Sequence, residues 1–160
     1  MKRYAEETSV SIGKSRGEIE DLLRSWRCSS IGWLDEFEQG RMTLQFMWRH
    51  QDVAYHARFT LTLPNDETLR KRARHATQGY FVESKYDRLK LHNGRQEMRT
   101  LLIFLKGALN AVEAGILDPA AVFLPFLVGQ DGRTVAEAAL PRMRELLISS
   151  ADRLLTGDTA

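Results

Sequence analysis

The segments "MTLQFMW" (residues 42–48) and "VAYHARFTLTL" (residues 53–63) carry the clearest periodic pattern in the chain. Apolar and polar residues alternate in both, and this period of two is typical of a β-strand with one buried face. The predicted inward side chains are Met42, Leu44, Phe46 and Trp48, then Val53, Tyr55, Ala57, Phe59, Leu61 and Leu63. The short connection "RHQD" predicts an antiparallel hairpin.

A third strand is predicted before this hairpin. Ile31, Trp33 and Phe37 indicate the strand, and "EQGR" indicates the turn that follows it. Pro64 ends the last strand because proline cannot donate a hydrogen bond to a ladder. The sequence therefore predicts a three-stranded antiparallel meander whose apolar face must be covered.

An N-terminal helix is predicted to begin near Ser15. "SRGE" fits a capping box between Ser15 and Glu18, and apolar residues then recur at helical spacing. These residues are Ile19, Leu22, Leu23 and Trp26.

The strongest candidate to cover the sheet is a helix from Gln96 to Gly115. Its broad apolar stripe consists of Met98, Leu101, Leu102, Leu105, Leu109 and Val112. Asp118 and Pro119 then predict the cap and first residue of a short helix that stops before Pro125.

A turn at residues 131–132 and a second capping box, Thr134 to Glu137, predict a last helix. This helix is expected to run towards Leu155, with a kink or restart at Pro141.

Residues 64–96 are the least determined part of the chain. "YFVESKYDRLKLHNG" (residues 80–94) fits a short strand and turn, or the irregular start of the next helix, and Asn93 and Gly94 favour a break. The predicted fold is therefore α+β: an N-terminal helix and meander (1–63), a basic connection (64–96), and C-terminal helices packed on one sheet face (97–156).

Length and composition favour one compact domain, because 160 residues with 43% hydrophobic side chains can bury a sizeable core. Cys28 is the single cysteine, which excludes an internal disulfide and favours a reducing cytoplasm. The stretch "MKRYAEETSVSIG" lacks the apolar core of a secretory signal, and no segment approaches the ~20 apolar residues of a membrane span. We expect a cytoplasmic protein with no membrane partner.

Positive charge is concentrated in the middle of the chain, although the net charge is only +2. Residues 1–63 carry nine Lys and Arg against nine acids, residues 64–99 carry nine against five, and residues 100–160 carry five against seven. A confined basic segment raises the local potential and attracts polyanions, although many such segments are simply solvated.

The sequence predicts no catalytic constellation. "IGKS" (residues 12–15) resembles the end of a phosphate-binding loop, but Thr8 stands where that loop needs its first glycine, which argues against a nucleoside triphosphatase. Lys14 and Arg16 lie beside a helix N-terminus, where an anion is favoured; the alternative is a cap with solvated neighbours.

Metal and covalent chemistry are not indicated either. No zinc-type spacing links the four histidines, His50, His56, His75 and His92. No base pairs with Cys28, and the acids at 35, 36 and 38 most simply keep a turn soluble. We expect a protein that is not an enzyme and that uses no cofactor and no metal.

The segment "LRKRARHATQGY" (residues 69–80) is the main candidate site. Its cations Arg70, Lys71, Arg72 and Arg74 suit phosphates, and Tyr80 suits stacking on bases, as do Phe81 and Tyr86. Arg58, together with His56, adds charge on the predicted outer sheet face. The alternative is an exposed connection, with Leu69, Phe81 and Val82 tucked into the core.

The chain also resembles a family of small, largely uncharacterised proteins encoded by bacteriophages and prophages. The resemblance is carried by "YAEETSVSIGKSRGEIEDLL", "RTLLIFLKGALNAVEAGI" and "FLVGQDGRTVAEAAL", and spans residue 4 to about residue 143. It implies an arginine-rich middle, which Arg70, Lys71, Arg72 and Arg74 match, and "KSR" (14–16) also matches. It implies location in the cytoplasm of a host bacterium but no particular reaction.

A phage setting favours two classes of noncatalytic function. We expect an accessory protein that binds nucleic acid through the basic central segment. The alternative is an inhibitor that binds a host defence protein, or that sequesters a signalling nucleotide where Lys14, Arg16 and the basic segment converge on one cavity.

Overall fold

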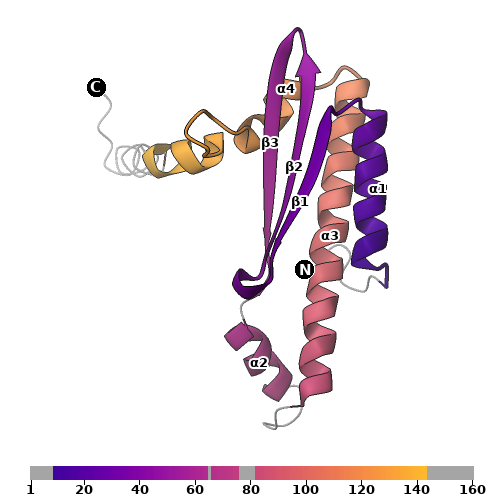
Figure 1. Ribbon diagram of the computed structural model, residues 1–160, viewed down its shortest axis with the longest axis vertical. Coiled ribbons are helices and arrows are strands. Elements are labelled where there is room, and N and C mark those ends of the chain that lie inside the picture. The colour runs from indigo at the N-terminus through magenta and orange to yellow at the C-terminus, as the bar shows by residue number, and fades with distance from the viewer. Residues whose placement is uncertain (1–8, 65, 76–81, 144–160) are drawn as a thin grey trace, which may run out of the picture.

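The computed structural model describes residues 9–64, 66–75 and 82–143. The chain is α+β, with an N-terminal helix, a three-stranded antiparallel meander and helices packed on it, as predicted (Figure 1). The elements in chain order are α1 (Ile12–Ser25), β1 (Ser30–Glu36), η1 (Phe37–Gln39), β2 (Arg41–His50), β3 (Val53–Thr62), α2 (Asp66–His75), α3 (Glu83–Glu113), α4 (Pro119–Phe123) and η2 (Leu124–Phe126). A further helical segment covers residues 135–143.

The strands form the predicted antiparallel meander, in the order β1-β2-β3. Trp33 lies opposite Leu44, and Leu44 lies opposite Phe59. The β2–β3 connection is a tight turn in which Gln51 and Asp52 both have positive φ, 49° and 62°. This backbone matches the right-handed twist of the flanking strands and closes the predicted antiparallel hairpin. Phe37, which we had placed in the first strand, belongs to η1 instead.

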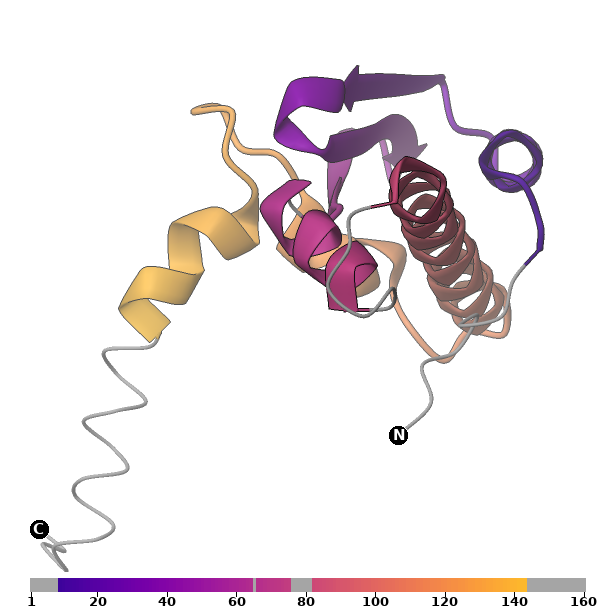
Figure 2. The same cartoon turned by 90° about the horizontal axis from the view of Figure 1, so that it is seen from below.

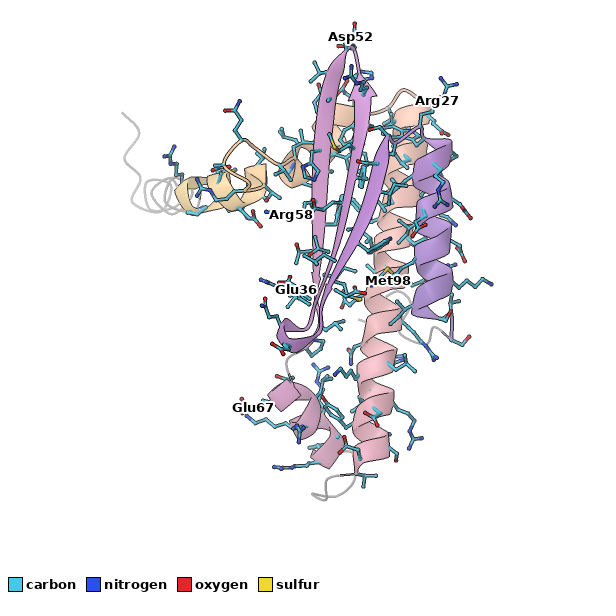
Figure 3. All side chains as sticks on the ribbon, in the orientation of Figure 1. Arg27, Glu36, Asp52, Arg58, Glu67 and Met98 are labelled. Atoms are coloured by element: carbon cyan, nitrogen blue, oxygen red, sulfur yellow. The ribbon has the colours of Figure 1, made fainter. Side chains whose placement is uncertain are left out.

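The core forms between the alternating face of the hairpin and α3. Leu44 and Phe46 are buried, and α3 covers them with Leu102, Leu105 and other buried residues. Figure 3 shows Met98 on the side of α3 that faces the sheet. The predicted covering role of this helix is therefore confirmed.

The first helix begins one turn earlier than predicted. Ser11, not Ser15, is the N-cap, and its hydroxyl accepts from the backbone N–H of Lys14 (3.2 Å). Ser15 is fully buried inside α1, and its Oγ has no hydrogen-bond partner in the described part of the chain. Ser11 has the same capping chemistry, and starting there adds Ile12 to the packed face of the helix.

Residues 64–96 do not form a loose connection, and the predicted break at Asn93 and Gly94 is wrong. The segment contains α2 and the first turns of α3, which is helical without interruption for 31 residues. Asn93 donates its side-chain amide to the carbonyl of Leu89 (2.7 Å). Gly94 faces α1, since a Cβ built there would lie 2.8 Å from Cδ1 of Ile12. The glycine marks a close helix contact, not a helix end.

A second, smaller apolar cluster holds α2 against the start of α3. It consists of Leu69 and Ala73 from α2 and Tyr86 from α3, with Leu89 beside them. Figure 1 shows this pair extending beyond the end of the sheet. We call α2 together with residues 83–95 of α3 the basic hairpin.

The capping predictions for the C-terminal part are confirmed. The carboxylate of Asp118 accepts from the amides of Ala120 and Ala121, and Pro119 opens α4. Thr134 and Glu137 form the reciprocal bonds of a capping box, 2.7 and 3.2 Å. Residues 135–143 extend away from the sheet (Figure 1), and the helix predicted to continue towards Leu155 lies outside the described residues beyond 143. No helix in the described ranges is long and apolar enough to cross a membrane.

Leu105→Ala tests the central packing. Leu105 is fully buried against the sheet, so its truncation should lower the free energy of unfolding by about 2–5 kcal/mol. Urea unfolding measures the change, and Asn110→Ala, at an exposed position of the same helix, is the control. A loss below about 1 kcal/mol for Leu105→Ala would contradict the packing described here.

Two glycines of α3 give a matched test of its continuity. Alanine is favoured over glycine inside a helix by about 0.5–1 kcal/mol. No atom lies within 4 Å of a Cβ at Gly107, so Gly107→Ala should stabilise the protein by that amount. Gly94→Ala should stabilise the protein by less, because the side chain of Ile12 must move to make room for the new Cβ. The full stabilisation should return when Ile12 is also replaced with Ala. Destabilisation by Gly94→Ala in both backgrounds would indicate a helix break.

Candidate nucleic-acid interface

The basic hairpin carries a net positive charge, whereas the rest of the chain does not. Residues 66–95 contain eight Lys and Arg against four acids, a net charge of +4, whereas the whole chain has +2. The remainder of the chain is therefore negative by two charges. A localised excess of this kind raises the potential where the hairpin protrudes from the sheet.

The packing of α2 turns its cations outward. Leu69 and Ala73 lie four residues apart and are buried against α3. Successive helical residues are rotated by about 100°, so Lys71 points directly away from α3, while the arginines flank it on both sides. All four cations are exposed: Arg70, Lys71, Arg72 and Arg74.

Cations from the two helices meet around one aromatic ring. The guanidinium of Arg70 lies 5.3 Å from the ring centroid of Tyr86, and Nζ of Lys90 lies 6.0 Å from it. Tyr86 is 6% exposed and belongs to the small cluster, so it positions these cations. The stacking of Tyr86 on a base, which the sequence suggested, is excluded by this burial.

The charge of Lys71 is only weakly neutralised. Lys71 forms an ion pair with Glu67 (2.7 Å), but both side chains are 73% exposed, and Figure 3 shows Glu67 on the outer side of α2. Exposed pairs of this type contribute little and exchange readily with other ions. Arg72 forms no ion pair within the described ranges, which leaves its charge available.

A purely structural role accounts for some of these cations as well. Arg72, Arg74 and His75 lie in the last turn of α2. Positive charge at a helix C-terminus interacts favourably with the unpaired carbonyl groups there. This effect explains cations in the last turn, but not those at Arg70, Lys71 or along the facing side of α3.

Arg16 is paired within the fold. Its guanidinium makes two hydrogen bonds to the carboxylate of Asp35, one of 2.9 Å, and lies 4.8 Å from the ring centroid of Trp33. The arginine thus ties α1 to β1. This pairing with Asp35 gives Arg16 a structural role and argues against it as a phosphate contact.

Lys14 is exposed but stands apart from the hairpin. It lies in the first turn of α1, and Figures 1 and 2 show α1 and α2 on opposite sides of α3. Lys14 therefore does not share a surface with the cations of α2.

Arg58 also serves the fold. It donates to the carbonyl of Gly132 (2.9 Å) and to Glu137 (2.6 Å), and so joins β3 to the last described helix (Figure 3). On the same strand, His56 is hydrogen bonded to Gln45 (3.0 Å). The bonds to Gly132 and Glu137 give Arg58 a structural role and argue against it as an anion contact. Tyr80 and Phe81 lie outside the described residues.

The cavities do not bring the predicted anion-binding residues together. A pocket of about 510 Å³ lies where the hairpin joins the sheet. Its charged lining residues are Glu36, Glu38, Arg41, Asp87 and Lys90, so acids outnumber cations. Another pocket, of about 550 Å³, is lined by Trp26, Trp48 and the start of α4. Lys14, Arg16 and the α2 cations line neither, so the expected nucleotide-sized anion pocket is not formed at these two cavities.

Reactive groups are few in the described ranges. No cluster of three or more His, Cys, Asp or Glu side chains suitable for a metal ion occurs among those residues. Burial raises the pKa of the Cys28 thiol to about 11. The thiol is therefore protonated at neutral pH and a poor nucleophile.

Sequence reasoning missed the contribution of α3 to this surface. Lys90 was treated as part of an irregular segment, and α2 was not recognised as a helix. The available signal was the four-residue spacing of Leu69 and Ala73, which puts both on one helical face.

Comparison of the chain with protein-family models, curated proteins and solved structures finds no match in any of the three.

Glu137 gives a test of the capping box and of Arg58. The amide of Thr134 donates to this carboxylate and holds its pKa below the ordinary value of 4.5, and the positive charge of Arg58 acts in the same direction. A lowered folded-state pKa stabilises the fold above pH 4.5, and the contribution is lost as the pH falls through the folded-state value.

Glu137→Gln should therefore lower the free energy of unfolding at pH 7. As the pH is lowered, the free energy of unfolding of the variant should fall less steeply than that of the wild type. The urea midpoint, followed by helical circular dichroism from pH 7 to pH 3, measures both effects. Glu113→Gln, at an exposed carboxyl in the last turn of α3, is the control. An acid profile of Glu137→Gln parallel to that of the wild type would contradict this role of Glu137.

Proposed function

We propose that this protein is a noncatalytic accessory protein that binds nucleic acid through the basic hairpin. The observation that carries the proposal is the outward display of Arg70, Lys71, Arg72 and Arg74 around a helix whose other side is packed on α3. Lys90, which lies at the Tyr86 ring together with Arg70, extends this positive surface onto α3. These charges are close together in the sequence, and the fold keeps them together on the protruding hairpin.

The chemistry of this surface favours phosphates over bases. A ten-residue helix is about 15 Å long, and duplex DNA carries on the order of nine phosphates along that length. Four cations on three sides of α2 can therefore each reach a phosphate from several orientations. The expected binding is weakly sequence dependent and strongly salt dependent.

The resemblance to bacteriophage and prophage proteins suggests the biological setting. In a phage-infected bacterium, a small nucleic-acid-binding protein would act during replication or recombination. This setting is part of the proposal, and the charge distribution of the hairpin is its physical support.

A second candidate function is the capture of a host protein. The segment 135–143 points away from the sheet and exposes Val135, Leu140 and Met143, at 37%, 48% and 49%. An apolar helical surface of this kind suits a groove in another protein. Such binding would tolerate salt, which distinguishes it from binding to phosphates.

Replacing Arg70, Lys71, Arg72 and Arg74 with Gln tests the main proposal. Each phosphate contact contributes about 0.9 to the slope of log K against log salt on duplex DNA. The variant should bind nucleic acids of unrelated sequence more weakly, and to a similar extent. The magnitude of its slope of log K against log salt should fall by up to about 4. Fluorescence anisotropy with single-stranded and duplex DNA and RNA across a salt series measures both quantities.

A matched control removes the same charge from the body of the protein. Arg24, Arg27, Arg49 and Arg133 are all exposed and lie outside the hairpin. Their replacement with Gln should leave most of the affinity and most of the salt slope. Equal losses in the two variants would show an effect of net charge alone, and unchanged binding by the hairpin variant would end the assignment.

A further inference from the structure

The two edges of the sheet differ. The middle of the β3 edge is occupied, because Ala57 pairs with Leu127 and the N–H of Val128 donates to the carbonyl of His56 (2.8 Å). Across the described ranges, no backbone group pairs with the outer edge of β1. Figure 2 shows no described element beyond β1 on the side away from β2. An edge of this kind offers a set of N–H and C=O groups to another strand.

β1 also lacks the features that commonly protect an edge strand. Its sequence "SIGWLDE" contains no proline and no lysine, and it pairs with β2 through seven consecutive residues without a bulge. Its two acids are already paired within the chain, Asp35 with Arg16 and Glu36 with Arg41. Neither charge is therefore left to repel a second strand.

We propose that β1 pairs antiparallel with β1 of a second copy of this chain, in a register centred on Trp33. The two sheets then form one six-stranded sheet about a two-fold axis. This register uses all seven residues of the strand. The facing pairs are Leu34 with Gly32, Asp35 with Ile31, and Glu36 with Ser30.

The strand is self-complementary in this register. Leu34 is 53% exposed, and no atom lies within 4 Å of a Cβ built at Gly32. Each Leu34 therefore covers the open backbone of the other copy's Gly32, and this occurs twice across the axis. The acids face neutral residues, so no like charges lie directly opposite each other.

The helical layer leaves room for the pairing. α1 lies over β1, since Arg16 and Glu20 both contact Trp33. Gly13 and Gly17 are exposed on α1, about 120° around the helix from Glu18, which contacts Arg99 of α3. The first half of α1 thus has no side chain at these two positions on the face turned away from α3, which leaves room for a second copy across the axis, whereas Glu20 and Arg24 lie on the same face further along.

One consequence rests on the proposed function. Antiparallel pairing of β1 reverses the second sheet, and the basic hairpin extends from one end of each sheet (Figure 1). The dimer therefore carries a positive hairpin at each of two opposite ends. Two linked sites of this kind raise the apparent affinity for a polyanion long enough to reach both.

Leu34→Lys tests the interface in solution. The wild-type chain is expected to dimerise in sedimentation velocity and light scattering across a concentration series. Two lysines placed at the shared edge should raise the dimer dissociation constant about tenfold or more. Thr60→Lys is the matched control, because Thr60 is exposed on β3 at the level of Leu34, on the same sheet face and at the opposite edge. It should leave the dimer intact.

Cross-linking tests the register without requiring the interface to be broken. Directly opposite residues of antiparallel strands have Cα atoms about 4.5–5.5 Å apart, within the range of a disulfide. In a Cys28→Ser background, Gly32→Cys and Leu34→Cys chains should form a disulfide-linked dimer when mixed. Either variant alone should cross-link far less.

A monomeric wild-type chain at all concentrations would overturn the proposal, as would a dimer indifferent to Leu34→Lys. Equal cross-linking in the mixture and in the separate variants would overturn the register. A dimer that binds no nucleic acid would overturn the proposed function and leave this interface standing.

Discussion

The contact between the apolar face of the β2–β3 hairpin and α3 organises the rest of this structure. Leu44, Phe46 and Phe59 supply one side, and α3 supplies the other. Phe123 from α4 closes the cluster, with its ring edge-on to those of Phe46 and Phe59. Aromatic pairs of this geometry add to the stabilisation from burial. Because α3 continues past the end of the sheet, the same helix that seals the core also carries the basic hairpin.

The sheet was predictable because its signal is local. Alternation along β2 and β3, turn residues and Pro64 are all properties of a few neighbouring residues. The caps at Asp118 and Thr134 were predictable for the same reason. The start of α1 was not, because Ser11 and Ser15 offer the same hydroxyl, and burial of Ile12 against α3 decides between them. The predicted break at Gly94 was wrong for a similar reason. In the sequence alone, a glycine required by a close helix contact looks the same as a glycine that ends a helix.

In the candidate site, too, local features were predictable from the sequence and tertiary contacts were not. The four cations of α2 are adjacent in sequence, so their grouping followed from the sequence alone. The structural roles of Arg16 and Arg58 could not be predicted because their partners are distant: Asp35 is 19 residues from Arg16, and Glu137 is 79 residues from Arg58. The position of Tyr86 beneath cations from two helices likewise depends on tertiary packing. Charge content was thus visible in the sequence, whereas the availability of each charge depended on the fold.

Among the described residues, the hairpin and the sheet have separate apolar clusters of very different size, and α3 contributes to both. The cluster between α2 and α3 has three buried side chains, whereas fifteen buried side chains form the main core. Since opening free energy follows the apolar area that is exposed, α2 should detach in sub-global excursions that leave the sheet folded. A polyanion bound across α2 and α3 would suppress those excursions, so occupancy and local order of the hairpin are thermodynamically linked.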